Sequence, residues 1–151
     1  MSAIRTAVVP VSEVFRLRRD VLRPGLPAAS AEFAEDTLPG TFHLAAYEGA
    51  GTRVLGCVTL FPDPLDGDTT AYRFRGMASD PVVRGLGYGA AVLAAAEREA
   101  AERGAGLLWC NGRTGARGFY ERHGYAVRGE EFVIEGVGPH YVFTRKIPSR
   151  A

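Results

Sequence analysis

A glycine-rich string in the middle of the chain has the spacing of an anion-binding loop. It consists of Arg84, Gly85, Leu86, Gly87, Tyr88 and Gly89 and directly precedes a stretch with helical periodicity. Glycines let the backbone come close to a ligand, and unpaired amides at a helix N-terminus attract anions, pyrophosphate above all. Arg84 adds a positive charge whose planar guanidinium matches a phosphate group. We therefore expect a phosphate-binding loop at residues 84–89.

Two other phosphate-binding patterns fit this string less well. A P-loop requires Gly-Lys followed by Ser or Thr, and the string contains no lysine. The dinucleotide spacing G-x-G-x-x-G/A is met by Gly85, Gly87 and Ala90, but it requires a carboxylate at the end of the next strand. That strand is followed by Cys110 and Asn111. The sequence disfavours a nicotinamide dinucleotide, while a glycine turn that merely starts a helix remains open.

The other reactive side chains give weaker signals. The two cysteines, Cys57 and Cys110, have no C-x-x-C partner, so we expect reduced thiols. Cys110 could act as a nucleophile, but no histidine or carboxylate stands beside it in the sequence. A small buried strand residue is the better interpretation. The histidines lack the H-x-x-x-H spacing of metal ligands, so we expect no metal site.

The elements around these residues predict an α+β fold. Expected strands are residues 3–9, 41–47, 53–61, 69–79, 107–110, 125–134 and 141–147. Expected helices are one opened by Pro10 and Ser12, one from residues 85–89 to about 103, one capped by Thr114 and ending at His123, and a short turn within residues 23–40. The first half thus resembles an antiparallel meander, and a β-α-β portion follows it.

Composition indicates one domain over residues 1–151, because 46% of the residues are hydrophobic and 23% are charged. The net charge of +1 gives no basic field that would attract nucleic acid or an anionic membrane. No apolar run approaches the ~18 residues of a membrane span. The N-terminus has no apolar segment typical of a signal peptide. We therefore expect a cytoplasmic protein with neither nucleic acid nor membrane as its partner.

Two motifs together resemble those of the GNAT acetyltransferase superfamily. The acetyl-CoA motif of that family is Q/R-x-x-G-x-G/A, and Arg84, Gly87 and Gly89 occupy its fixed positions. Downstream, the string A-x-x-F-Y-E-R-H-G-Y is similar to the second family signature, at Ala116, Tyr120, Gly124 and Tyr125. This chain departs from the family at Tyr125, where Phe is usual, and at Arg113, where Asn is frequent.

The resemblance implies a fold, a cofactor and site residues. The fold would be a mostly antiparallel sheet of about seven strands, splayed between the fourth and fifth and flanked by about four helices. Acetyl-CoA would lie in the splay as co-substrate. Backbone groups of Met77, Ala78 and Ser79 would hold its pantetheine arm, with one amide donating to the thioester carbonyl. Tyr120 would protonate the departing CoA thiolate.

The implied function is an acetyl-CoA-dependent N-acetyltransferase that moves an acetyl group directly to a primary amine of a small molecule or peptide. Three alternatives stay open: a longer acyl-CoA as donor, a hydroxyl as acceptor, and a CoA-binding or partner-binding module without catalysis. A homodimer is compatible with the sequence.

The general base and the acceptor are the least determined features of the sequence. Candidate bases are His43, His140, Glu32, Glu35 and Asp36, and His140 is favoured because the last two strands flank the acceptor in this family. The three carboxylates at residues 32–36 would also attract a cationic amine. A cationic acceptor next to this loop is one interpretation of the carboxylates, and a solvated surface loop is the other.

Overall fold

The chain folds around one mixed sheet of seven strands. The structure is a computed structural model and describes residues 3–148. The strands are β1 (Ile4–Val9), β2 (Phe42–Glu48), β3 (Gly56–Pro62), β4 (Tyr72–Ser79), β5 (Leu107–Arg113), β6 (Ala126–Ile134) and β7 (Gly138–Lys146). The α-helices are α1 (Val11–Leu22), α2 (Tyr88–Glu102) and α3 (Arg117–Arg122). Four 3-10 turns lie at η1 (Ala28–Ala31), η2 (Ala34–Thr37), η3 (Pro81–Val83) and η4 (Thr114–Ala116).

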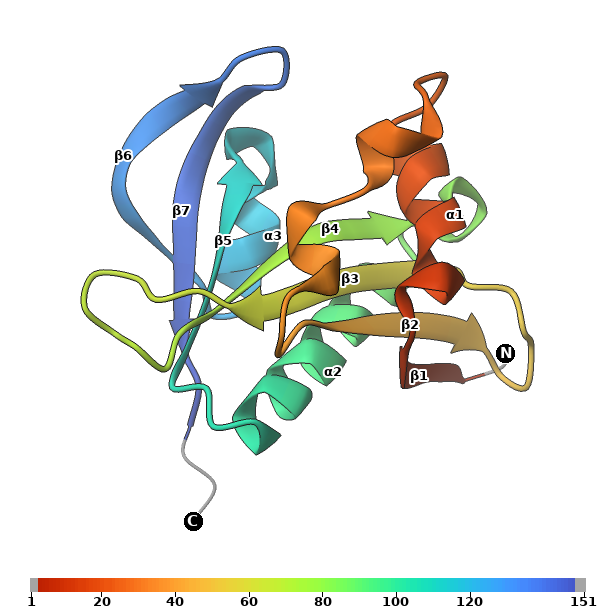
Figure 1. Ribbon diagram of the computed structural model, residues 1–151, viewed down its shortest axis with the longest axis horizontal. Coiled ribbons are helices and arrows are strands. Elements are labelled where there is room, and N and C mark those ends of the chain that lie inside the picture. Colours follow the sequence, from red (N-terminus) through yellow and green to blue (C-terminus); the bar gives the residue numbers. More distant parts are fainter. Residues whose placement is uncertain (1–2, 149–151) are drawn as a thin grey trace.

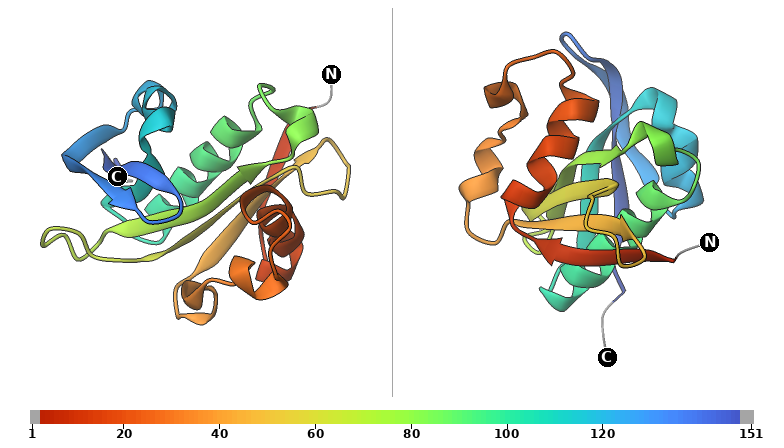
Figure 2. Two further views of the ribbon diagram at one scale, coloured as in Figure 1. Left: turned by 90° about the horizontal axis from the view of Figure 1, so that it is seen from above. Right: turned by 90° about the vertical axis from the view of Figure 1, so that its right-hand side faces the viewer.

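The helices cover the two faces of this sheet separately. The strand order is β1-β2-β3-β4-β5-β7-β6, and every neighbouring pair is antiparallel except β4 and β5. Helix α1 lies on one face, whereas α2 and α3 lie on the other (Figures 1 and 2). The predicted apolar stripe of α2, which is Val92, Leu93, Ala96 and Ala100, is buried in the larger core. The smaller core packs Val14 and Leu17 of α1 against Ala45 and Cys57.

The α+β class and the seven-stranded, mostly antiparallel sheet are confirmed. About four helices were expected, and residues 3–148 contain three α-helices and four 3-10 turns. The prediction that Thr114 caps the third helix is wrong, because Thr114 begins a 3-10 turn and its hydroxyl donates to Glu131 Oε2 at 2.8 Å. Strand β4 begins at Tyr72 and not at residue 69, since the Asp68 side chain accepts bonds from the Thr70 amide and hydroxyl and holds a turn there.

Strands β4 and β5 pair over a short length only. Their parallel register joins Tyr72 to Leu108 and Arg73 to Trp109, and no pair follows in the remainder of either strand. Strand β4 also carries a bulge opposite β3. Cys57 pairs with Ala78 and Thr59 pairs with Arg75, so β4 advances three residues where β3 advances two. The two strands therefore diverge toward their C-terminal ends (Figure 1), and their backbone groups on the facing edges lack strand partners there.

A fully buried arginine ties the segment after α1 to the sheet. Arg18 donates to both carboxylate oxygens of Asp36 at 2.8 and 3.0 Å, to Thr59 Oγ1 at 2.6 Å and to the Ala31 carbonyl at 3.0 Å. Its guanidinium also lies 3.9 Å from the centre of the Phe33 ring. Because a buried charge is tolerated only when it is paired and hydrogen-bonded, this set of partners fixes residues 28–37 against α1 and β3.

We predict that Asp36→Asn lowers the free energy of unfolding at pH 7 by about 3 kcal/mol, because it leaves the Arg18 charge buried without its counterion. Burial alone would raise the pKa of the Asp36 carboxyl, but hydrogen bonds from Arg18 and from the Phe33 amide outweigh it and lower that pKa. The contribution of Asp36 is therefore complete above about pH 4 and is lost as the pH falls through the folded-state pKa. Urea unfolding of both proteins between pH 7 and pH 2.5 measures this.

The exposed pair Arg16–Asp20, one turn apart on α1, supplies the control. Asp20→Asn should change the free energy of unfolding by no more than about 0.5 kcal/mol. Equal losses in the two variants would mean that the buried pair contributes no more than a surface pair.

Candidate functional site

A cleft of about 510 Å³ occupies the space between the diverging halves of β4 and β5. Residues 73–79 of β4 form one side and residues 110–113 of β5 form the other. Gly89 at the start of α2 closes one end, and Phe119 and Tyr120 of α3 line the face on which α2 lies. The end of α1, Phe33 and the β6–β7 hairpin contribute to the opposite face. The cleft thus passes through the sheet at the point where hydrogen bonding between strands stops.

The predicted phosphate loop leads directly into α2. Gly85 and Gly87 have φ angles of 79° and 91°, values that a side chain disfavours. The first bond of the helix runs from the Ala91 amide to the Gly87 carbonyl, so the amides of Tyr88, Gly89 and Ala90 have no acceptor within the helix. Free amides and the positive end of a helix dipole at this end of the cleft are the groups that attract an anion.

The other members of this loop contribute differently. The Leu86 amide already donates to the Val83 carbonyl at 3.1 Å, and the Leu86 side chain is exposed. The Tyr88 ring is buried in the main core, so only its backbone faces the loop. Arg84 is exposed and makes no ion pair with any residue in the described range 3–148, so its charge is available to a ligand. A Cβ at Gly89 would lie 3.8 Å from the hydroxyl of Ser79, which joins this loop to the end of β4.

The bulge of β4 is built on a glycine that the segment after α1 crowds. Gly76 has a φ of +68°, and a Cβ there would lie 2.7 Å from Cε2 of Phe33. Phe33 is held in place by Arg18 on one side and by Arg75, whose guanidinium also lies 3.9 Å from the ring centre. Met77, Ala78 and Ser79, to which the resemblance assigns the pantetheine arm, follow the bulge and line the cleft.

Tyr120 is buried beside the cleft within an aromatic cluster. Its ring stacks on Phe143 at 4.6 Å and meets Phe119 edge-on at 5.4 Å. Gly112 of β5 makes room for it, because a Cβ at that position would lie 2.6 Å from the tyrosine ring. Burial, together with the nearby Cys110, raises the pKa of the Tyr120 hydroxyl, so it stays protonated at neutral pH. Phe143, Phe119 and Gly112 together hold the ring in one orientation beside the cleft.

The same burial argues against a reactive cysteine at this site. Cys110 lines the cleft as a free thiol, and burial raises its pKa to about 12. The thiolate that would serve as a nucleophile is thus scarce at neutral pH. Cys57 is free and buried as well, and burial raises its pKa to about 12.

His140 is the candidate base that lines the cleft. It is 4% exposed, and it lies opposite Arg113 in the register of β5 and β7. Its Nδ1 lies 2.7 Å from the carbonyl of Gly138, and since a carbonyl only accepts, Nδ1 carries the proton. The lone pair of the neutral ring is therefore on Nε2. Phe132 stacks on the ring at 5.9 Å.

The other candidate bases are used elsewhere in the structure. His43 is buried with Nδ1 2.8 Å from Thr59 Oγ1, and burial lowers its pKa. Asp36 is paired with Arg18, and Glu35 is paired with Arg75 at 3.0 Å. Glu32 is exposed and lines a separate hollow beside α1. None of these four residues lines the cleft.

Sequence reasoning missed the arginines of the cleft, which are Arg23, Arg73, Arg75 and Arg113. The alternation of Tyr72 and Phe74 with two arginines was visible in the β4 sequence, and it places those arginines on the face away from α2. Arg23 lies at the end of α1, and Arg113 lies at the end of β5. Only the fold brings these two residues to the same cleft.

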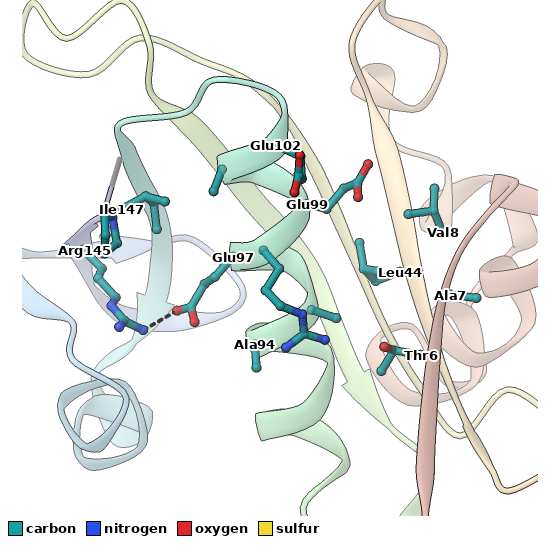
Figure 3. Close-up of a pocket in the computed structure, with 14 residues that line it drawn as sticks. Thr6, Ala7, Val8, Leu44, Ala94, Glu97, Glu99, Glu102, Arg145 and Ile147 are labelled. Carbon is teal, nitrogen blue, oxygen red and sulfur yellow. Dashed lines mark hydrogen bonds and ion pairs between the residues drawn. The ribbon is translucent and has the colours of Figure 1, made fainter. Parts of the chain in front are cut away.

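A larger hollow of about 780 Å³ lies across α2 from the cleft, between that helix and β1 (Figure 3). Glu97 and Arg145 in its wall pair with each other at 2.9 Å, and the residues around them are mostly small or aliphatic. It is lined by neither histidine nor tyrosine, and the glycine loop does not reach it. This hollow therefore lacks the tyrosine, the histidine and the start of α2 that line the cleft.

Two further findings concern the described part of the chain, residues 3–148. It contains no cluster of three or more His, Cys, Asp or Glu side chains that could hold a metal ion. None of its helices has the length and apolar character that crossing a bilayer requires.

The comparisons with known proteins agree on one family. The family model described as the acetyltransferase (GNAT) family matches residues 11–125. The uncharacterized N-acetyltransferase YitI of Bacillus subtilis (strain 168) is 29% identical over 144 residues, which are 95% of this chain and 97% of YitI. A candidate N-acetyltransferase from Lactobacillus plantarum superposes with a TM-score of 0.79 at 22% identity, over 97% of this chain and 99% of that one. An acyl-CoA N-acyltransferase from Pseudomonas aeruginosa gives 0.76 at 17%, over 95% and 99%.

We predict that Gly76→Ala destabilises the protein more than Gly67→Ala does. Both glycines have positive φ, which costs an alanine about 1–2 kcal/mol, but space around Gly67 is open whereas Phe33 crowds Gly76. The overlap with Phe33 should add at least about 1 kcal/mol to the loss at Gly76. Urea unfolding of both variants measures the difference. Equal losses would mean that Phe33 moves aside freely and does not constrain the bulge.

Proposed function

Because this chain belongs to the GNAT acetyltransferase family, we propose that it is an N-acetyltransferase that uses acetyl-CoA and transfers the acetyl group directly to a primary amine. The observation that carries the proposal is the cleft between β4 and β5, which joins an anion-binding helix N-terminus to a buried, protonated tyrosine. A phosphate-bearing thioester whose sulfur leaves as a thiolate requires both features.

The glycine loop would hold the pyrophosphate of CoA. Three helix amides without acceptors and the unpaired Arg84 supply donors and charge at that end. Gly89 keeps the approach open beside Ser79. Met77, Ala78 and Ser79, which follow the bulge, would bond the pantetheine arm as an added strand does, and an amide among them would donate to the thioester carbonyl.

Tyr120 would act as the general acid. A thiol has an ordinary pKa near 8.5, whereas the pKa of the Tyr120 hydroxyl is raised well above its ordinary value. Tyr120 therefore keeps its proton until the CoA thiolate forms beside the hydroxyl. The stacked Phe143 and the close fit over Gly112 hold the phenol ring in one orientation. Such fixed geometry allows the hydroxyl to meet the sulfur as the carbon–sulfur bond breaks.

His140 would act as the general base on the other side of the sheet. Tyr120 belongs to the core beneath α2 and α3, whereas the alternation of β5 puts Arg113, and with it the paired His140, on the opposite face from Cys110. An amine that enters from the α1 side would then lose its proton to Nε2, while the thiolate gains one from the α3 side. The base and the acid would thus reach the reacting carbon from opposite faces of the sheet, within one cleft.

We predict that Gly87→Val and Arg84→Ala weaken acetyl-CoA binding, by at least about tenfold for the valine variant, because valine disfavours the φ of 91° and shields the loop amides. Isothermal titration calorimetry with acetyl-CoA measures the affinity. Gly67→Val is the control, since Gly67 has a φ of 85° in open space away from the cleft. Unchanged affinity in both loop variants would remove this loop from the CoA site.

We predict that Tyr120→Phe lowers kcat by about 10²–10⁴ and leaves acetyl-CoA affinity nearly unchanged, because only the leaving-group proton is lost. His140→Gln should lower kcat by about 10², and its deficit should shrink as the pH approaches ~10, where a primary amine is itself deprotonated. Release of free CoA, followed with a thiol reagent over a panel of amines, measures both.

Tyr125→Phe serves as the matched control, because Tyr125 is an equally buried phenol that bonds Glu97 at 2.8 Å and does not line the cleft. It should retain most of the activity. Full turnover in Tyr120→Phe would assign the acid role to water or to another group. A series of acyl-CoA lengths and a hydroxyl acceptor in the same assay distinguish acetyl transfer to an amine from the two related reactions. Tight CoA binding with no release on any acceptor would indicate a binding module.

A further inference from the structure

We propose that the acceptor is a small amine that also carries a carboxylate or phosphate group, and that Arg23 and Arg113 bind this anionic group. The inference rests on the proposed function and names the acceptor class for the same cleft. It reverses the expectation of a cationic acceptor that the carboxylates of residues 32–36 suggested from the sequence.

The charges that line the cleft have one sign. Four arginines line it and no aspartate or glutamate does, among the residues that the structure describes. The arginines are Arg23, Arg73, Arg75 and Arg113. A cleft with walls of low dielectric concentrates the field of such charges, so it attracts anions and repels a second positive charge on the acceptor.

Two of these arginines already have carboxylate partners outside the lining. Arg75 pairs with Glu35 at 3.0 Å and stacks on Phe33, and Arg73 lies 3.7 Å from Asp63. Arg23 donates to the Leu22 carbonyl at 2.9 Å. Within residues 3–148, neither Arg23 nor Arg113 forms an ion pair with a carboxylate. Arg23, which is half-buried, and Arg113, which is exposed, are therefore the two cleft-lining arginines without a carboxylate partner among the described residues.

These two arginines lie at the acceptor side. Phe74 packs in the core beneath α2, so the alternation of β4 puts Arg73 and Arg75 on the α1 face, and their neighbours Trp109 and Arg113 of β5 share that face. Arg113 is register-paired with His140, which sets their Cα atoms about 5 Å apart. Arg23 closes the same face from the end of α1. An anion held there lies a few bonds from an amine at His140.

The other end of the cleft has its own anion-binding groups. The helix amides and Arg84 lie beside Gly89 and Ser79, where α2 begins, and they suffice for the pyrophosphate of CoA. The arginines of the α1 face are thus free for a second anion. The cleft of about 510 Å³ must also admit the pantetheine arm, so the second ligand is small.

The carboxylates near the cleft do not oppose this assignment. Glu35 and Asp36 are paired with Arg75 and Arg18, and Glu131 does not line the cleft. Glu32 lines the neighbouring hollow beside α1 and not the cleft. The acidic segment therefore positions the arginine-bearing wall and leaves the cleft itself positive.

The test compares acceptors that differ only in the anionic group. Each α-amino acid is assayed against its amide, and O-phosphoethanolamine against ethanolamine, with putrescine as the cationic reference and rates expressed per unprotonated amine. We expect kcat/KM to be about 10- to 100-fold higher for the anionic member, the gain of a charge-assisted bond pair. The amino acid and phosphate arms tell the two sources of the anion apart. The preference should shrink as salt is added.

Variants then test which residues cause the preference for an anionic acceptor. Arg23→Ala and Arg113→Ala should each reduce it about tenfold or more by raising the acceptor KM, with the acetyl-CoA affinity unchanged. Arg98→Ala is the control of equal charge, because Arg98 is exposed in the hollow behind α2. If either cleft variant weakens CoA binding and leaves the preference intact, the two arginines belong to the CoA site and the inference is overturned.

Measurements of turnover and of binding distinguish the inference about the acceptor from the proposed function. Neutral or cationic amines acetylated as efficiently as anionic ones would overturn the inference and leave the proposed function standing. Calorimetric binding of the preferred amino acid to the CoA-saturated protein, abolished in Arg113→Ala but without any turnover, would uphold the inference and overturn the proposed function. Absence of both binding and turnover across the panel would overturn both.

Discussion

The short pairing of β4 with β5 is the constraint on which the rest of the molecule depends. A parallel pair requires a crossover, and here that crossover is α2, whose N-terminus therefore comes to the C-terminal ends of the two strands. After two residue pairs the strands separate, and the bulge at Gly76 turns β4 further away. The opening exposes backbone groups that a sheet would normally satisfy. A ligand with an extended amide arm can satisfy them instead.

The wall opposite α2 depends on buried charge. Arg18 has no exposed surface, and it bonds a carboxylate, a hydroxyl and a carbonyl while lying over Phe33. Because a charge in the interior is costly without partners, the segment that supplies them has little freedom to leave. Arg75 covers the other side of the same phenylalanine and reaches the cleft. The network thus carries rigidity from the core to the acceptor side.

The two sides of the sheet have different chemistry. The face under α2 and α3 is aromatic and dry around Tyr120, which raises the pKa of its hydroxyl and keeps it protonated. The face under α1 carries the arginines and His140, whose Nδ1 lies 2.7 Å from the Gly138 carbonyl. The cleft is lined from both faces, by Tyr120 on one and by His140 on the other.

The sequence by itself determined the features that depend on local spacing. Alternate glycines before a helical stretch predicted the turn that leads into α2, hairpin signals predicted the antiparallel meander, and the spacing from Ala116 to Tyr125 indicated the family. Periodicity also predicted the buried stripe of α2. These succeed because they rest on conformational preferences of neighbouring residues.

The tertiary structure alone decided what the remote residues do. The sequence made Asp36 and Glu35 candidate bases, yet the fold brings Arg18 and Arg75 to them, so they hold the wall and do not line the cleft. Arg23 and Arg113 are 90 residues apart in the chain and line one cleft because α1 and β5 flank the splay. Charge in a cleft is a sum over all elements that reach it, and no local pattern records that sum.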